Sequence, residues 1–321
     1  MEILPGKGSL SVSRGGDPLA LGILVLGVVG IAWAPIFFRL SEVGPVTTAF
    51  WRVLLAIPLL YGWWLADFRG RRGTVPGPRG WRDAALLLSG GVLFAGDLVF
   101  WHWSLTWTSV ANATLFANAA PVFVAILGWV LLGRRVGLVF LAGLVLAMAG
   151  AGVLMGASLT EGVGHLTGDL LAIVAAVFLA AYLLVVERLR SRFRTSTIML
   201  WNAAGGAAVL FPLALATEDR LMPAGWQGWA VLAGLAAISH AAGQGLIAQA
   251  MSRLQAAFTS VSLLLQPLLA AVFAWMVLAE PLSLQQGIGG LVILAGIVLA
   301  RIGSRDAGPG PKARTPRTSA S

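Results

Sequence analysis

Residues 111–132 read ANATLFANAAPVFVAILGWVLL, and residues 257–278 read AFTSVSLLLQPLLAAVFAWMVL. A shift of 146 residues aligns the two stretches without a gap and places Pro121 on Pro267 and Trp129 on Trp275. The same shift also aligns small residues further along the chain: Gly143, Ala149 and Gly150 fall on Gly289, Ala295 and Gly296. Because proline, tryptophan and glycine positions coincide, we interpret the match as an internal repeat.

The composition around this repeat indicates a membrane protein. The 321 residues are 58% hydrophobic and 11% charged, with a mean hydropathy of +0.86, whereas a soluble domain is about 45–50% apolar and about 25% charged. A water-soluble fold of this length could not bury so much apolar surface. The chain has no cysteine, which excludes disulfides, thiol nucleophiles and thiolate metal sites.

A bilayer core about 30 Å thick is crossed by roughly 20 apolar residues of helix. Cutting the chain at charges and turn residues gives ten such runs. The expected spans are 18–38, 44–66, 84–107, 109–133, 136–157, 168–186, 195–216, 228–251, 256–279 and 283–300. The first run lacks a convincing A-x-A cleavage site, so we expect a retained helix rather than a signal peptide.

The distribution of basic residues supports this count and orients the chain. Cytoplasmic loops carry the excess of Lys and Arg. With ten spans and both termini inside, all of the 22 Lys and Arg except Arg39, Arg52 and Arg220 fall in inside segments. We therefore predict a multi-pass protein of the inner (plasma) membrane with both termini cytoplasmic. Membrane orientation explains the net charge of +9 better than nucleic-acid binding does.

The repeat maps span four onto span nine and span five onto span ten, so each unit has five helices. An odd number inserts the second unit upside down, and inverted repeats are typical of secondary transporters. The predicted fold class is an all-α integral membrane protein with ten transmembrane helices as two inverted five-helix repeats. The predicted parts are a cytoplasmic N-terminal segment (1–17), a first repeat (18–157), an external linker (158–167), a second repeat (168–301) and a disordered basic cytoplasmic tail (302–321).

Several motifs resemble those of EamA-type permeases of the drug/metabolite transporter superfamily, over residues 18–301. They are Trp33-Ala34-Pro35-Ile36-Phe37 with Arg39, Gly44-Pro45, Ala49-Phe50-Trp51-Arg52, Gly96-Asp97-Leu98-Val99-Phe100-Trp101-His102-Trp103, Gly243-Gln244-Gly245 and Leu264-Leu265-Gln266-Pro267. Family members carry Gly-Glu-Arg at the end of span four, where this chain has Gly133-Arg134-Arg135, whereas Glu280 keeps the acid in the second half. The resemblance implies a transporter of small metabolites, an exporter rather than an importer, and names no substrate.

Ionisable groups at membrane depth are functional candidates by default, and Arg52 and Asp97 are the clearest ones. At a rise of about 1.5 Å per residue, Arg52 lies about 12 Å below the outer start of its span and Asp97 about 20 Å above the cytoplasmic start of its own. Because these depths nearly coincide, we predict a buried ion pair or two groups facing one aqueous cavity. The pair either locks spans two and three together or serves in gating or proton coupling.

Other polar residues within the spans are candidates for substrate binding or coupling: Thr114, Asn118, His240, Gln244 and Gln266. Each either lines a cavity or hydrogen-bonds a neighbouring helix. Pro121 and Pro267 are candidates for functional kinks in gating, although helix bundles in membranes also tolerate such prolines. We interpret His102, between Trp101 and Trp103, as part of an interfacial aromatic belt.

The sequence does not favour an enzyme. It has no H-E-x-x-H motif, no paired intramembrane carboxylates and no Walker-type loop, so we expect no catalytic residue, metal site or cofactor. The expected function is secondary transport by alternating access, with a small-molecule substrate and the lipid bilayer as partners and no nucleic acid. The alternatives are import of the same substrates, a membrane-embedded enzyme or a non-transporting sensor. Glycines of spans five and ten favour close packing within the bundle or between protomers of a homodimer.

Overall fold

The computed structural model describes residues 17–70, 77–104, 107–108, 110–155, 166–279 and 282–306. The predicted N-terminal segment, linker and tail lie largely outside these residues, as does Glu280. Ten helical stretches of the described chain are long and apolar enough to cross a membrane, which agrees with the predicted number. They are Pro18–Arg39, Pro45–Gly70, Trp81–Ser104, Ala113–Leu132, Leu138–Met155, Leu166–Arg190, Thr195–Thr217, Trp226–Ala250, Ala256–Val277 and Leu284–Ser304.

Half of these spans are interrupted. The first two are α1 (Pro18–Ala32) with α2 (Ala34–Arg39) and α3 (Pro45–Leu54) with α4 (Ala56–Gly70). The fourth contains α6 (Val110–Ala117) and α7 (Ala120–Leu132), and the ninth contains α13 (Ala256–Leu263) and α14 (Leu265–Leu278). The eighth contains α11 (Trp226–Gly234), the π-helix η2 (Leu235–Gln244) and α12 (Gly245–Ala250).

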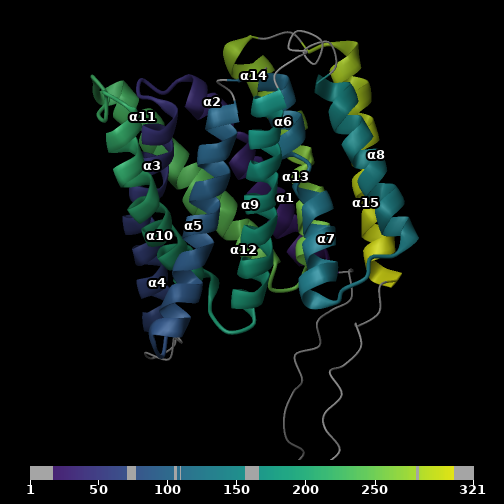
Figure 1. Ribbon diagram of the computed structural model, residues 1–321, viewed down its shortest axis with the longest axis horizontal. Coiled ribbons are helices and arrows are strands. Elements are labelled where there is room, and N and C mark those ends of the chain that lie inside the picture. Colours follow the sequence, from purple (N-terminus) through teal and green to yellow (C-terminus); the bar gives the residue numbers. More distant parts are fainter. Residues whose placement is uncertain are drawn as a thin grey trace, which may run out of the picture.

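The other spans are single helices: α5 (Trp81–Ser104), α8 (Leu138–Met155), α9 (Leu166–Arg190), α10 (Thr195–Thr217) and α15 (Leu284–Asp306). Figure 1 shows the helices standing side by side, with α8 and α15 together at one edge of the bundle. We call the end where α1 begins and α15 ends the terminal face, and the opposite end the far face. Helix α9 continues to Arg190, beyond the predicted end at 186, because long arginine side chains reach the membrane surface from within a helix.

The ends of the helices confirm the repeat. A shift of 146 places the end of α6 on the end of α13 and the end of α7 on the end of α14. Both interrupted spans break just before a proline, Pro121 or Pro267, which cannot supply a backbone N–H. Gly133 and Ala279 end α7 and α14 in the left-handed conformation, with φ of 63° and 54°. Equivalent positions therefore stop and interrupt the helix in the same way.

Helices α8 and α15 pack through glycines that the same shift relates. A Cβ on Gly143 would lie 2.3 Å from the backbone nitrogen of Ala300, and one on Gly289 would lie 2.4 Å from that of Leu154. Gly143 corresponds to Gly289 and Leu154 to Ala300, so the two contacts are copies of each other. Two equivalent contacts at one crossing are what two inverted repeats produce. These glycines therefore serve packing within the bundle.

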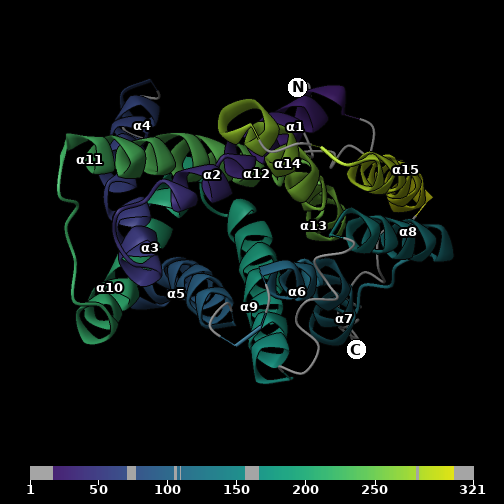
Figure 2. The ribbon, with the colours of Figure 1, turned by 90° about the horizontal axis from the view of Figure 1, so that it is seen from above.

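The two halves interlock. Helix α1 of the first half packs against η2 and α12 of the second, while α9 of the second half packs against α5, α6 and α7 of the first. In Figure 2, α9 lies beside α5 and α6, and α1 lies near α12, at the opposite end of the row from α11. The core is consequently shared between the halves rather than divided into two domains.

Acidic side chains join the ends of these helices in related pairs. Asp17, just before α1, accepts a hydrogen bond from Arg253 in the turn after α12, and Asp169 of α9 accepts one from Thr108 in the equivalent turn after α5 at 2.8 Å. The hydrogen bond from Arg253 holds the pKa of Asp17 below its ordinary value. At the far face Glu218 accepts hydrogen bonds from the first backbone amides of α3, at 2.6 and 3.0 Å.

Candidate functional site

Arg52 lies in the interior of the bundle. It comes near the end of α3 and only 9% of its surface is exposed. Its guanidinium carbon lies 5.4 Å from the centre of the Phe94 ring on α5, within the range of a cation–π interaction. A buried cation is expensive unless other groups compensate its charge, so the surroundings of Arg52 are the first place to look for function.

The ring of Phe94 connects Arg52 to two further helices. Its centre lies 5.3 Å from that of Tyr182 on α9 and 5.3 Å from that of His240 on η2. Tyr182 and His240 are both buried. The side chains come from α3 and α5 of the first half and from α9 and η2 of the second. We call Arg52, Phe94, Asp97, Tyr182 and His240 the Arg52 cluster.

Asp97 lies one turn after Phe94 on α5 and is half-buried. It interacts electrostatically with Arg52 and Tyr182, but no ion pair within 4.0 Å joins it to Arg52 in the described structure. The direct ion pair, the first of the two predicted arrangements, is therefore not formed in this conformation, and the second, two groups facing one aqueous cavity, stays a prediction. The ion pair does not form because the Arg52 guanidinium lies over the Phe94 ring instead.

Three buried nitrogen atoms of this cluster have no hydrogen-bond partner among the described residues: Nε of Arg52 and both ring nitrogens of His240. Leaving a buried polar group unpaired costs about 1–3 kcal/mol. His240 is 2% exposed and lies in a π-helix, a geometry that is rare and frequent at functional sites. The cluster therefore has the unsatisfied polar groups that a binding site for a polar molecule requires.

The other predicted polar residues occupy different parts of the fold. Gln244 ends η2, one turn after His240. Asn118 lies in the break between α6 and α7, and its buried amide nitrogen has no hydrogen-bond partner in the part of the chain that the structure describes. Thr114 lies on α6, and Gln266 precedes Pro267 at the start of α14. These last three residues mark the paired helix breaks, so the candidates divide between the Arg52 cluster and the interrupted spans.

Sequence reasoning missed Phe94 and Tyr182, because aromatic residues in apolar spans give no signal of their own. A signal for Phe94 was available, since the shift of 146 places it on His240. The interpretation of His102 as an interfacial residue is wrong. Its ring is buried against Phe38, with ring centres 5.0 Å apart, and its Nδ1 hydrogen-bonds to the carbonyl of Leu98 at 2.5 Å.

A ten-span bundle of two inverted repeats, with a buried polar cluster where the halves meet, defines a polytopic membrane transporter as its class. The chain belongs to the EamA-like transporter family, whose model matches residues 18–156 and 166–302. This confirms the resemblance to the drug/metabolite transporter superfamily. Among the described residues no group of three or more His, Asp or Glu side chains is placed to hold a metal ion.

Several transporters are similar to the chain. An uncharacterized transporter of Archaeoglobus fulgidus is 28% identical over 86% of this chain and 96% of its own length. A probable terminal-alkyne amino-acid exporter of Streptantibioticus cattleyicolor is 29% identical over 73% of this chain and 78% of its own length. The pseudopaline exporter of Pseudomonas aeruginosa is 26% identical over 67% of this chain and 75% of its own length. A crystal structure with 20% identity and a TM-score of 0.76, covering 91% of this chain and 99% of the other, shares the fold.

Proposed function

We propose that this protein is a secondary transporter that exports small zwitterionic metabolites across the inner (plasma) membrane by alternating access. The observation that carries the proposal is the Arg52 cluster, a buried group of polar side chains contributed by both halves. In inverted-repeat transporters the substrate binds near the midplane between the repeats. Opposite movements of two interlocked halves would expose such a site to one side of the membrane and then the other.

The charges of the cluster favour a zwitterion. Arg52 and Asp97 lie near each other without a direct ion pair, so each is available to a partner of opposite charge. A cargo with one carboxylate and one ammonium group would neutralise both and add no net charge to the membrane interior. Its carboxylate would also satisfy the Nε of Arg52, and Phe94 and Tyr182 supply apolar surface for the rest of the molecule.

The similar proteins support the direction. Two of them are named as exporters, and one of these as an amino-acid exporter. The excess of Lys and Arg near the terminal face favours a cytoplasmic location for that face. Export then requires that the terminal face admits the cargo and the far face releases it. The breaks before Pro121 and Pro267 are the places where the fourth and ninth spans would bend during this cycle.

The test is a resistance assay in an efflux-deficient bacterium that expresses the protein, with a panel of toxic amino-acid analogues. We expect the wild type to raise the inhibitory concentration of one class, and Asp97→Asn to abolish most of this at an equal membrane level. A loss of about tenfold in transport corresponds to about 1.4 kcal/mol. Asp169→Asn is the control, because this acid lies at the far face outside the cluster. No resistance to any analogue in the wild type would contradict export of zwitterions.

A further inference from the structure

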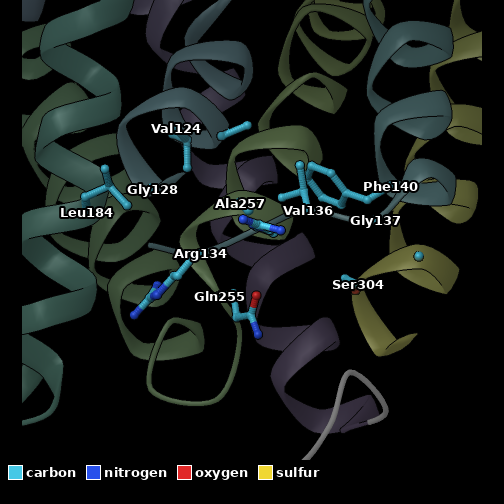
Figure 3. Close-up of a pocket in the computed structure, with 13 residues that line it drawn as sticks. Val124, Gly128, Arg134, Val136, Gly137, Phe140, Leu184, Gln255, Ala257 and Ser304 are labelled. Carbon is cyan, nitrogen blue, oxygen red and sulfur yellow. The ribbon is translucent and has the colours of Figure 1, made fainter. Parts of the chain in front are cut away.

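A pocket opens at the terminal face between α7, α8, α9, α13 and α15 (Figure 3). Its apolar wall includes Val124, Phe140 and Leu184, and its polar side chains are Arg134, Arg135, Gln255 and Ser304. The cavity measures about 40 Å³, which is room for a few water molecules but not for a metabolite. The elements around it come from both halves, so this small pocket lies at a boundary that alternating access has to open.

One of the arginines that line this pocket, Arg134, is already paired with a carboxylate, which belongs to Glu187 near the end of α9. Its Oε2 pairs with Nη1 of Arg134, directly after α7. Its Oε1 accepts a hydrogen bond from the backbone N–H of Ala256, the first residue of α13, at 3.2 Å. An arginine and a helix N-terminal amide together are a favourable receptor for a carboxylate. Glu187 fills this receptor from within the protein.

The same contact ties the two interrupted spans together. Arg134 follows α7, the segment after the break of the fourth span, and Ala256 begins α13, the segment before the break of the ninth. The carboxylate of Glu187 holds both at the terminal face. Releasing it would let α7 and α13 separate about their breaks and enlarge the pocket.

A second cation in the pocket remains available. Arg135 is exposed and makes no hydrogen bond or ion pair with another described residue. An incoming carboxylate can approach Arg135 first and then replace Glu187 at Arg134. Gln255 and Ser304 line the same space and offer neutral hydrogen-bond donors.

We propose that this pocket is the cytoplasmic entrance of the transport path and a binding site for the carboxylate group of the cargo, which Glu187 occupies while the entrance is closed. The assignment of the entrance rests on the proposed function, since export places the loading side at the terminal face. Arrival of a carboxylate displaces Glu187 from Arg134 and from α13, and this exchange couples loading to opening.

The chain offers a matched control for the closing contact. The ion pair Arg192–Asp83 also lies at the terminal face, and its side chains are 53% and 13% exposed, against 49% and 13% for Arg134–Glu187. Asp83 accepts a backbone hydrogen bond as Glu187 does, from Arg79 at 3.2 Å. The two pairs differ in their arginines, because Arg134 lines the pocket and Arg192 does not. Asp83→Ala therefore removes a carboxylate from an ion pair of similar exposure, as Glu187→Ala does, but leaves the residues around the pocket unchanged.

The experiment measures access to the pocket by cysteine labelling. Because the natural chain has no cysteine, Ala125→Cys introduces the only one, on the pocket wall. The Ala125→Cys protein is the parent, and the test variant carries Glu187→Ala in addition. In inside-out membrane vesicles, a membrane-impermeant maleimide should label the test variant about fivefold faster than the parent, because the closed state has lost one helix-capping interaction. Glu187→Gln should be intermediate, and Asp83→Ala should equal the parent. Equal rates for Glu187→Ala and the parent would overturn the closing role.

The carboxylate site is tested with acetate and acetamide as probes. In Glu187→Ala the receptor is vacant, so acetate should slow the labelling, about twofold at a concentration equal to its dissociation constant. Acetamide, which lacks the charge, should not, and Arg134→Gln should remove the effect of acetate. Equal effects of acetate and acetamide would overturn the carboxylate site. Since labelling requires no cargo, these outcomes are independent of the resistance assay, which alone decides whether zwitterions are exported.

Discussion

The two halves of this protein share their packing and differ in their charges. Where the fourth and ninth spans break and end, and where α8 and α15 cross, both halves use the same means at equivalent positions: a proline after the break, a left-handed residue at the helix end and glycines at the crossing. At the Arg52 cluster the equivalence fails. Phe94 corresponds to His240, and Asp97 to Gly243, whose missing side chain lets η2 approach α1, with a Cβ there 2.9 Å from the backbone nitrogen of Ile31.

This difference separates the features that the two repeats share, which are packing positions, from those that they do not share, which are charged side chains. If the protein works by the proposed alternating access, the pseudo-symmetric parts would let the two ends of the bundle open by equivalent movements. A cargo bound at the proposed site would be a single molecule with one orientation, so a site on the pseudo-symmetry axis would gain nothing from having each charge twice. Two copies of Asp97 or of Arg52 at that depth would place like charges together in a medium where charge is costly.

The largest effect should come from the crossing of α8 and α15. Gly143→Ala and Gly289→Ala each place a methyl group within 2.4 Å of backbone atoms, so the helices must move apart. We expect each variant to lower the free energy of unfolding by about 1–3 kcal/mol. If the two contacts are equivalent, the two variants should lower it by the same amount. Gly152→Ala on α8, which meets nothing within 4 Å, is the control. Unfolding in mixed detergent micelles measures the three variants, and a silent Gly143→Ala would contradict the close crossing.

Much of this fold could be predicted from the sequence because the bilayer restricts it. Every backbone group in lipid has to be satisfied within its own helix, so apolar runs of sufficient length translate directly into spans. The shift of 146 then fixed the inversion through parity alone. Helix interruptions were predicted only at Pro121 and Pro267, whereas η2 contains no proline and its π-helical geometry leaves no mark in the sequence.

The site could be predicted only in part. The cost of charge in lipid singled out Arg52 and Asp97, and residue counting gave their similar depth. Counting along a helix fixes the height of a side chain but not the direction in which it points, so the stacking of Arg52 on Phe94 could not be foreseen. Glu187 was missed for a related reason: one of its partners is the backbone amide of Ala256, and a backbone group has no sequence signal.

A smaller effect should separate the two helix ends. Gly133 and Ala279 share the left-handed conformation, which costs an L-residue about 1–2 kcal/mol and glycine almost nothing. Gly133→Ala should therefore destabilise the protein by about 1 kcal/mol, and Ala279→Gly should stabilise it by a similar amount. Nothing lies within 4 Å of a Cβ at Gly133, so no clash contributes there. The same unfolding assay measures both variants, with Gly62→Ala as the control. If Gly133→Ala and Ala279→Gly changed the free energy of unfolding in the same direction, the two helix ends would not be equivalent.

The smallest effect concerns Asp17 and Asp169, which hold equivalent turns with different chemistry. Asp17 pairs with the charged Arg253, and Asp169 with the hydroxyl of Thr108. The folded-state pKa of Asp17 is lowered from 3.8, chiefly by the hydrogen bond from Arg253. Its contribution to stability is therefore fully present above pH 3.8 and is lost as the pH falls through the lower folded-state value.

Asp17→Asn should accordingly lower the melting temperature slightly at neutral pH and low salt. The difference from the wild type should shrink in high salt, because exposed ion pairs are screened. Asp169→Asn keeps an oxygen that can accept from Thr108, so any change it causes should not depend on salt. A salt-independent effect of Asp17→Asn would assign its role to capping α1, where its Oδ1 accepts from the backbone N–H of Leu19 at 3.0 Å. The two equivalent turns would then both be held by neutral hydrogen bonds, and the difference in charge between the halves would be confined to the Arg52 cluster and the pocket at Glu187.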